Sequence, residues 1–197
     1  MLPPRYVVPV EPVYQMTVAQ YHAAVRAGIF GEDDDIELLE GLLVQKMPKK
    51  RPHVVALVKV SRAVEEVLPR GWSAQSQDPV TLDDGEPEPD LAVIRGRPED
   101  YVDEHPGAKD IALLVEVSDT TLDRDRGIKL RSYARAGVPV YWIVNLNDRR
   151  VEVYSAPDAT ASPPCYRACA TANEGETLRA VIDGAVCGEL RVGELLP

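Results

Sequence analysis

Pro89-Asp90-Leu91-Ala92-Val93-Ile94 places an acidic residue at the start of an apolar run, and Ala112-Leu113-Leu114-Val115-Glu116-Val117-Ser118 places a second one inside another. Both runs are short, rich in branched residues and bounded by polar or turn-forming sequence, which predicts two buried strands. A carboxylate in such a run is costly unless another group pairs with it. One acid on each of two strands therefore indicates a shared partner, and a divalent cation is the simplest.

Each acid also has an ordinary structural interpretation. Asp90 follows a proline at the start of a strand, where aspartate is common as a turn former. Glu116 follows the apolar residues 112–115, so it is either a ligand or a buried carboxylate that is satisfied by hydrogen bonds. The two alternatives stay open for each residue taken alone, and only the combination of both acids favours a site.

The strand that carries Glu116 supplies further oxygen atoms. Alternation along a strand places Glu116 and Ser118 on one face and Val117 on the other, but the backbone carbonyl of Val117 remains within reach of an ion held by Glu116. Asp90, Glu116 and this carbonyl form a set of oxygen ligands only. Such a set suits Mg²⁺ or Mn²⁺ rather than zinc.

A bound ion of this kind can polarise a phosphodiester and generate hydroxide from water. Phosphoryl chemistry also needs a cation near the developing negative charge, and Lys129 is the candidate. It lies on the helix predicted after the Glu116 strand, and Tyr133 follows one turn later on the same face. Taken alone, Lys129 is also compatible with an ordinary solvated helix position.

Length and composition predict one domain. The chain has 197 residues, of which 45% are hydrophobic and 27% charged, as in globular proteins. We expect an extended, proline-rich arm over residues 1–15 and a single domain over residues 16–197.

No apolar stretch approaches membrane-spanning length and the first residues lack the apolar core of a signal peptide, so we expect a cytoplasmic protein. Cys165, Cys169 and Cys187 form no Cys-x-x-Cys pair, which argues against a disulfide framework and a zinc site.

The net charge of −10 weakens a general affinity for nucleic acid, which depends on Lys and Arg. The charge is uneven, however, and a local basic patch can bind an anion on an acidic protein. Basic residues gather in 46–51 and 124–135, whereas acidic residues gather in 32–35, 83–88 and 99–104.

The remaining pattern predicts helices and strands around a mixed sheet, so the class is α/β or α+β. We expect helices at 17–28, 53–68 and 123–136. We expect strands at 36–39, 42–44, 72–82, 89–94, 111–118, 140–144 and 150–154. Residues 156–164 are predicted to be a linker, and residues 166–196 a β-extension that closes on the main body.

Several motifs together resemble the Uma2 family of endonucleases, which belongs to the restriction-endonuclease-like superfamily. That superfamily has the signature Pro-Asp, a spacer and (Asp/Glu)-x-Lys. The likeness extends from about Thr17 to Leu196 and is most specific between Glu116 and Trp142. It rests on Ile36-Glu37-Leu38-Leu39-Glu40-Gly41, Met47-Pro48, His53, Pro89-Asp90, Glu116-x-Ser118, Lys129, Tyr133, Gly137-Val138-Pro139-Val140-Tyr141-Trp142-Ile143-Val144 and Arg150-Val151-Glu152-Val153-Tyr154.

The resemblance implies a central mixed sheet flanked by helices, with the metal site on the face of the sheet. It suggests Glu37, Asp90 and Glu116 as the acidic site residues. Glu37 has an equal alternative as a surface residue of an edge strand, and Glu40 is better interpreted as a turn residue. The implied activity is Mg²⁺- or Mn²⁺-dependent hydrolysis of nucleic acid, with DNA as the expected substrate.

The resemblance also suggests accessory residues and contains one departure. Gln77 is expected near the pocket or in solvent, and His53 is expected to cap or line the site rather than bind metal. The wider superfamily has Lys where this chain has Ser118, as the Uma2 family commonly does. Lys129 would therefore have to replace that lysine from the helix, with Arg126 as a second candidate.

The leading hypothesis is thus a metal-dependent endonuclease. The alternative is a catalytically quiet binding or regulatory module on a nuclease fold, motivated by the net charge and by Ser118. A homodimer is compatible with either hypothesis, since related nuclease folds often pair to cut two strands. The apolar tail and the strand with Trp142 are the expected interface.

Overall fold

The computed structural model describes residues 12–197, so most of the arm predicted over residues 1–15 lies outside the described residues. Helix α1 (Val18–Arg26) begins at a capping box formed by Thr17 and Gln20, as the sequence predicts. The hairpin of β1 (Ile36–Leu39) and β2 (Leu42–Gln45) follows, with Glu40 and Gly41 at positive φ in its turn.

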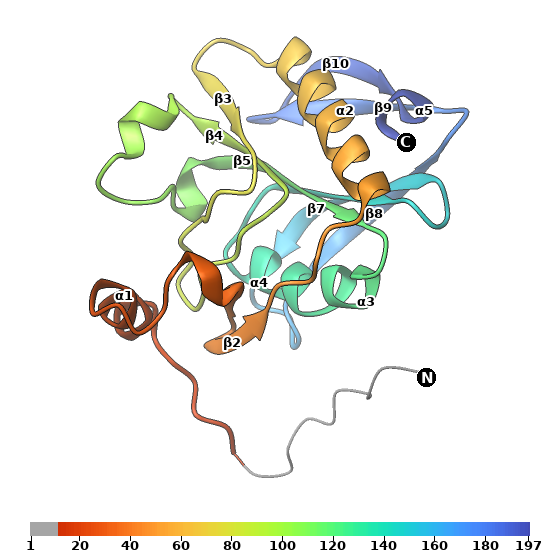
Figure 1. The fold of residues 1–197 in the computed structure, drawn as a ribbon. Helices are drawn as coiled ribbons and strands as arrows, with labels where there is room; N and C mark the ends of the chain where they lie inside the picture. Colours follow the sequence, from red (N-terminus) through yellow and green to blue (C-terminus); the bar gives the residue numbers. More distant parts are fainter. Residues whose placement is uncertain (1–11) are drawn as a thin grey trace, which may run out of the picture.

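A six-stranded sheet forms the centre of the protein (Figure 1). Its order is β3-β4-β5-β6-β7-β8, and every neighbouring pair is antiparallel except β5 and β6, which are parallel. This arrangement confirms the predicted mixed sheet. The strands are β3 (Trp72–Gln75), β4 (Leu91–Arg95), β5 (Ile111–Ser118), β6 (Val140–Asn145), β7 (Arg150–Asp158) and β8 (Cys165–Asn173).

Two apolar layers bury the two faces of this sheet. Helix α2 (Arg51–Val67), the antiparallel hairpin of β9 (Thr177–Ile182) and β10 (Ala185–Arg191), and the short α5 (Val192–Leu195) cover one face. Val117 and Trp142 belong to this layer. The other face packs against the helix between β5 and β6, and Leu114 and Tyr141 belong to that layer. The predicted alternation along β5 therefore holds, with Glu116 and Ser118 turned away from α2.

The crossover between the parallel strands carries an interrupted helix. It runs as α3 (Leu122–Arg124), a π-helical turn (Asp125–Lys129) and α4 (Leu130–Arg135). The sequence predicted one regular helix over 123–136. A π turn inserts an extra residue into the helical repeat and is frequent at functional sites. Here both Asp125 and Lys129, at the ends of this turn, are buried.

Three sequence predictions about the sheet need correction. The strand expected over 72–82 ends at Gln75, because Gln77 has a φ of +60° and Pro79 cannot donate to a ladder. The linker expected over 156–164 is shorter, since β7 continues to Asp158 and β8 begins at Cys165. The first strand of the predicted β-extension, β8, is part of the central sheet, and only β9 and β10 form a separate pair.

The structure also bears on the expected dimer interface and on membranes. Trp142 is fully buried in the central strand β6, so this strand offers no surface to a second copy. The homodimer therefore remains a prediction, and the strand with Trp142 is not its interface. Among residues 12–197, no helix combines the length and the hydropathy that crossing a membrane requires.

Candidate active site

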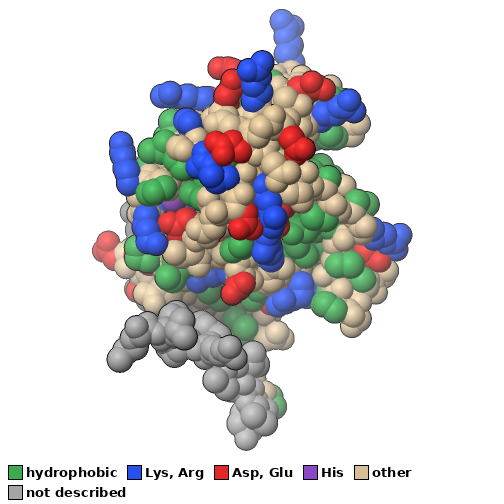
Figure 2. All heavy atoms as spheres, turned by 90° about the vertical axis from the view of Figure 1, so that its right-hand side faces the viewer, with side chains coloured by type: hydrophobic (Ala, Val, Ile, Leu, Met, Phe, Trp, Pro, Cys, Tyr) green, Lys and Arg blue, Asp and Glu red, His purple; other side chains and the backbone are tan. Residues whose placement is uncertain are grey.

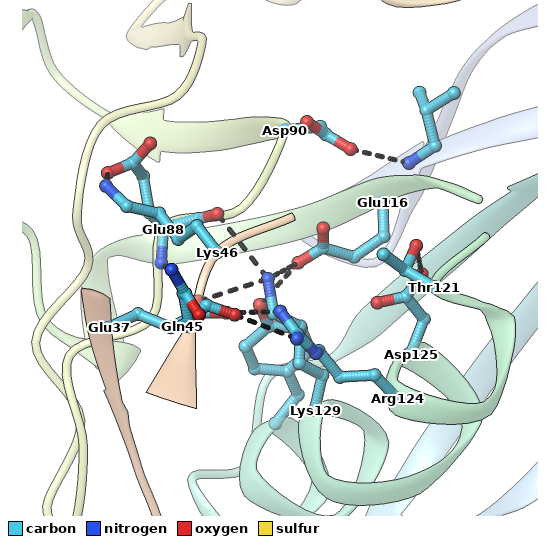
Figure 3. A network of polar contacts seen from close by, with 12 residues as sticks. Glu37, Gln45, Lys46, Glu88, Asp90, Glu116, Thr121, Arg124, Asp125 and Lys129 are labelled. Atoms are coloured by element: carbon cyan, nitrogen blue, oxygen red, sulfur yellow. Dashed lines mark hydrogen bonds and ion pairs between the residues drawn. The ribbon is translucent and has the colours of Figure 1, made fainter. Parts of the chain in front are cut away.

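A small cavity of about 60 Å³ opens between the carboxyl end of β5, the π turn and the connection from β2 to α2. Acidic side chains from four segments meet at it, and Figure 3 shows how they lie around Lys129. The acidic residues that line it are Glu37, Glu88, Asp90, Glu116, Asp119 and Asp125. The structure therefore brings together all four residues that the sequence proposed as catalytic, namely Glu37, Asp90, Glu116 and Lys129.

Glu116 lies at the bottom of this site and is only 4% exposed. The Lys129 ammonium and the Tyr133 hydroxyl both donate to Glu116 Oε1, each at 2.8 Å. Burial raises the pKa of Glu116 well above its ordinary value, and the nearby carboxylates add to this against the opposing charge of Lys129. The predicted relation between Lys129 and Tyr133, one helical turn apart on one face, is the geometry observed.

Lys129 joins two of the acids. Its Nζ lies 3.3 Å from Glu37 Oε2 as well as 2.8 Å from Glu116 Oε1. Burial acts to lower the pKa of Lys129, but the charges of Glu116, Glu37 and Asp125 outweigh it and raise the pKa above its ordinary value. Lys129 therefore keeps its positive charge at neutral pH although it is only 5% exposed.

Glu37 is a buried residue and not a surface residue of an edge strand. It is 2% exposed, its Oε2 accepts a hydrogen bond from the Glu88 backbone N–H at 3.2 Å, and Arg124 approaches its Oε1 at 3.5 Å. Glu40 occupies the β1–β2 turn, as expected, and pairs with Arg131 and Arg135 outside the cavity. These contacts hold the hairpin against the helix that carries Lys129.

Asp90 is fixed from two sides just before β4. His53, in the first turn of α2, places Nε2 3.0 Å from Asp90 Oδ1, and the Val117 N–H donates to Oδ2 at 2.8 Å. These hydrogen bonds outweigh the effect of burial and lower the pKa of Asp90. His53 thus orients an acid of the site, in line with the expectation that it lines the site.

Asp125 is a site residue that the sequence analysis missed. Its Oδ2 accepts hydrogen bonds from Ser118 Oγ at 2.5 Å and from Thr121 Oγ1 at 2.7 Å. Burial raises the pKa of Asp125. The available signal was its place four residues before Lys129 on the predicted helix, which puts both on one face. Lys46, Glu88 and Arg124, which also reach the cavity, carried no comparable signal.

Two accessory candidates lie outside the cavity. Arg126 points away from it and donates through Nε to Glu152 Oε2 at 2.9 Å. Gln77 follows β3 in a bend, and its backbone N–H donates to the Asp90 carbonyl at 3.2 Å while its side chain does not line the cavity. Arg126 therefore offers no second cation to the acids.

Comparisons with known proteins agree with this arrangement. The sequence profile of the family described as "Uma2: Putative restriction endonuclease" matches residues 18–184, which is most of the chain. The chain belongs to the Uma2 family. This membership places it among nucleases. A search of curated proteins gave no significant match.

Solved structures support the Uma2 fold. The crystal structure of a "putative nuclease belonging to DUF820" from Anabaena variabilis ATCC 29413 aligns with a TM-score of 0.66 and 16% identity, covering 91% of this chain and 97% of that one. At this identity the match shows the fold. The apo form of NucC from Escherichia coli MS115-1 aligns at a TM-score of 0.30 and 14% identity, over 42% of this chain and 45% of that one, which carries no structural argument.

The Uma2 site departs from the superfamily signature in the way the sequence suggested. Ser118 stands where the signature has Lys, and its hydroxyl is bonded to Asp125. The ammonium of Lys129 reaches Glu116 from the π turn instead. A lysine therefore accompanies the two strand acids, although it comes from the next element along the chain.

The donor set of the site fits a hard divalent cation. The Asp90 and Glu116 carboxylates and the Val117 carbonyl offer oxygen only, and the His53 imidazole that lines the cavity is bonded to Asp90. Four buried acidic groups, those of Glu37, Asp90, Glu116 and Asp125, surround one buried ammonium, and a bound cation would oppose the burial that raises the pKa of Glu116 and of Asp125. Within residues 12–197, no three acidic, His or Cys side chains already form a metal-binding group.

The Glu152 network beside the site is expected to make stability depend on pH. Hydrogen bonds from Arg126, Tyr154 and Asn145 outweigh burial and lower the pKa of Glu152 from 4.5 to about 2. A depressed pKa contributes stability above pH 4.5, and this contribution is lost as the pH falls toward 2. We expect Glu152→Gln to lose less stability than the unaltered protein between pH 5 and pH 3, as measured by urea unfolding. Identical pH profiles for the two proteins would contradict the predicted role.

Proposed function

We propose that this Uma2 protein is a Mg²⁺- or Mn²⁺-dependent endonuclease that hydrolyses phosphodiester bonds of DNA. The observation that carries the proposal is the meeting of Lys129 Nζ with Glu116 and Glu37, at 2.8 and 3.3 Å, in a cavity that Asp90 also lines. A charged lysine among strand carboxylates is the combination that phosphodiester hydrolysis requires.

Each residue has a distinct role in the proposal. Asp90, Glu116 and the Val117 carbonyl would hold the cation, which when bound supplies Lewis-acid polarisation of the phosphate and a more acidic water. His53 and the Val117 N–H orient Asp90. Lys129 stabilises negative charge that develops on the phosphate oxygens. Glu37 keeps Lys129 charged and in place, or orients a water.

The proposal is tested with purified protein and plasmid DNA in Mn²⁺, beside Asp90→Asn. We expect the unaltered protein to nick or linearise the plasmid only with the ion, and the variant to be inactive because an amide is a poorer ligand for a hard cation. Equal cleavage by the two proteins would mean a contaminating nuclease. Absence of cleavage in both Mg²⁺ and Mn²⁺ would reject the proposal.

One observation favours the alternative of a catalytically quiet module. Protein groups already engage both strand acids, with His53 and the Val117 N–H on Asp90 and with Lys129 and Tyr133 on Glu116. Isothermal titration with Mn²⁺ distinguishes the two functions. An enzyme site binds the ion in a manner that Glu116→Gln weakens, whereas a quiet module shows no binding that depends on Glu116.

A further inference from the structure

The opening of the active-site cavity has a basic border on one side. Residues 46–51 connect β2 to α2 and carry Lys46, Lys49, Lys50 and Arg51, and residues 46–50 line the cavity directly. In Figure 1 this connection rises from β2 to α2 near α3. We call residues 46–51 the basic rim.

Two lysines of the basic rim, Lys49 and Lys50, are available to an anion, whereas Lys46 is paired with Glu88 at 2.8 Å. Lys50 is 62% exposed in its side chain and stands 3.6 Å from Asp119, which is a weak pair. Lys49 is exposed and forms no ion pair with any residue of the described chain. Exposed ion pairs contribute only about 0–1 kcal/mol, so a phosphate can replace them at little cost.

An acidic groove adjoins the cavity. It shares Glu37, Lys46 and Glu88 with the cavity and runs between α1 and residues 98–110. Acidic residues dominate this groove, so it repels a phosphate backbone. They are Glu37, Glu86, Glu88, Asp100, Asp103, Glu104 and Asp110, against the basic residues Arg26, Lys46 and Lys109.

The acidic excess of the chain is therefore distributed unevenly around the site. Figure 2 views the molecule from the right-hand side of Figure 1, where Lys and Arg side chains project from the surface with acidic side chains between them. The net charge of −10 does not exclude a local path for an anion on such a face. Binding along such a path is expected to weaken as the salt concentration rises.

The size of the cavity decides where the substrate lies. The cavity has a volume of only about 60 Å³ and opens to solvent, so we expect a nucleotide to lie across its mouth rather than inside it. Only the reacting phosphate group approaches the acids, and its neighbours in the strand stay outside at the border. Phosphates at the border need cations, and the basic rim is the side that offers them.

We propose that the DNA backbone crosses the basic rim, with Lys49 and Lys50 contacting the phosphates next to the one that reacts. This inference rests on the proposed function and adds the side from which the substrate approaches. The acidic groove beside the cavity stays free of DNA. Lys49 and Lys50 position the strand and take no part in the chemistry, since neither pairs with the buried carboxylates Glu37, Asp90 or Glu116.

The test measures binding of a fluorescent DNA duplex by anisotropy at several salt concentrations, with EDTA present so that no cleavage occurs. Each phosphate contact contributes about 0.9 to the slope of log affinity against log salt, so Lys49→Ala/Lys50→Ala is expected to lower that slope by about two. The matched control is Lys109→Ala/Arg179→Ala. It removes the same charge, at Lys109 in the groove and at Arg179 on an exposed position of β9, and is expected to leave the slope unchanged.

The outcomes separate this inference from the proposed function. An unchanged slope in Lys49→Ala/Lys50→Ala, with an unaltered protein that binds and cleaves DNA, would overturn the basic rim alone. An equal loss in the control pair would mean that only net charge matters, and would also overturn it. An unaltered protein that neither binds nor cleaves DNA would overturn the proposed function itself. As a second measurement, the variant should keep its cleavage rate at saturating DNA and lose rate only at low DNA.

Discussion

Lys129→Met is expected to lower the rate of Mn²⁺-dependent DNA cleavage by about 10²–10³-fold, the usual cost of removing one preorganised group that stabilises charge in a transition state. Methionine keeps the unbranched chain and removes the ammonium that lies 2.8 Å from Glu116. The loss should appear in the rate at saturating DNA, because Lys129 is buried behind the basic rim and contributes little to binding of the strand.

Lys109→Met is the matched control for this measurement. Lys109 is exposed in the acidic groove, so the substitution removes the same charge without touching the carboxylate cluster. We expect its cleavage rate to stay within about twofold of the unaltered protein, as for surface substitutions away from a site. Retained activity in Lys129→Met, at equal folded fraction by circular dichroism, would show that Lys129 is a structural counter-ion only.

Much of the fold was predictable because its signals are local. The capping box at Thr17 and the uninterrupted apolar run from Ile111 to Val115 specified α1 and β5 without reference to the rest of the chain. The end of β3 at Gln75 was missed, because the apolar residues Val80 and Leu82 continue the alternation beyond residues 76–79. The left-handed conformation of Gln77 and the proline at 79 end the strand instead.

Site residues were predictable where an acidic residue lies within an apolar stretch of sequence. Asp90 and Glu116 stand out against the aliphatic residues around them. Asp125 does not, because it lies in a segment rich in charge, where a solvated residue and a buried one look alike. Its burial accompanies the π turn, and the one available signal was its spacing of four residues from Lys129.

The buried pair of Lys129 and Glu116 is also expected to contribute strongly to the free energy of unfolding. Removing one partner of a buried ion pair costs about 3–5 kcal/mol, because the remaining charge stays out of water without compensation. We therefore expect a loss of this size in Lys129→Met, which leaves both Glu116 and Glu37 without their shared cation. Urea unfolding at pH 7 measures it.

A double-mutant cycle with Glu116→Gln shows whether the cost belongs to the pair. The double variant should lose less than the sum of the single variants, with a coupling of about 0.5–3 kcal/mol, as for residues in contact. The exposed pair Arg149–Glu174, whose side chains are 45% and 48% exposed, is the control and should show a much smaller coupling than the buried pair. Additive losses at the buried pair would mean that the two charges are solvated separately.

The pH dependence of the stability of Lys129→Met shows how the remaining acids respond to the loss of the ammonium. Burial already raises the pKa of Glu116, and Lys129→Met removes the positive charge that opposes this rise. A group whose folded pKa lies above its unfolded value stabilises the fold at low pH and loses that contribution as the pH rises. The destabilisation of Lys129→Met should therefore be smaller at pH 5 than at pH 7. Equal losses at both values would mean that Glu116 stays ionised, with another cation in the cluster taking the place of Lys129.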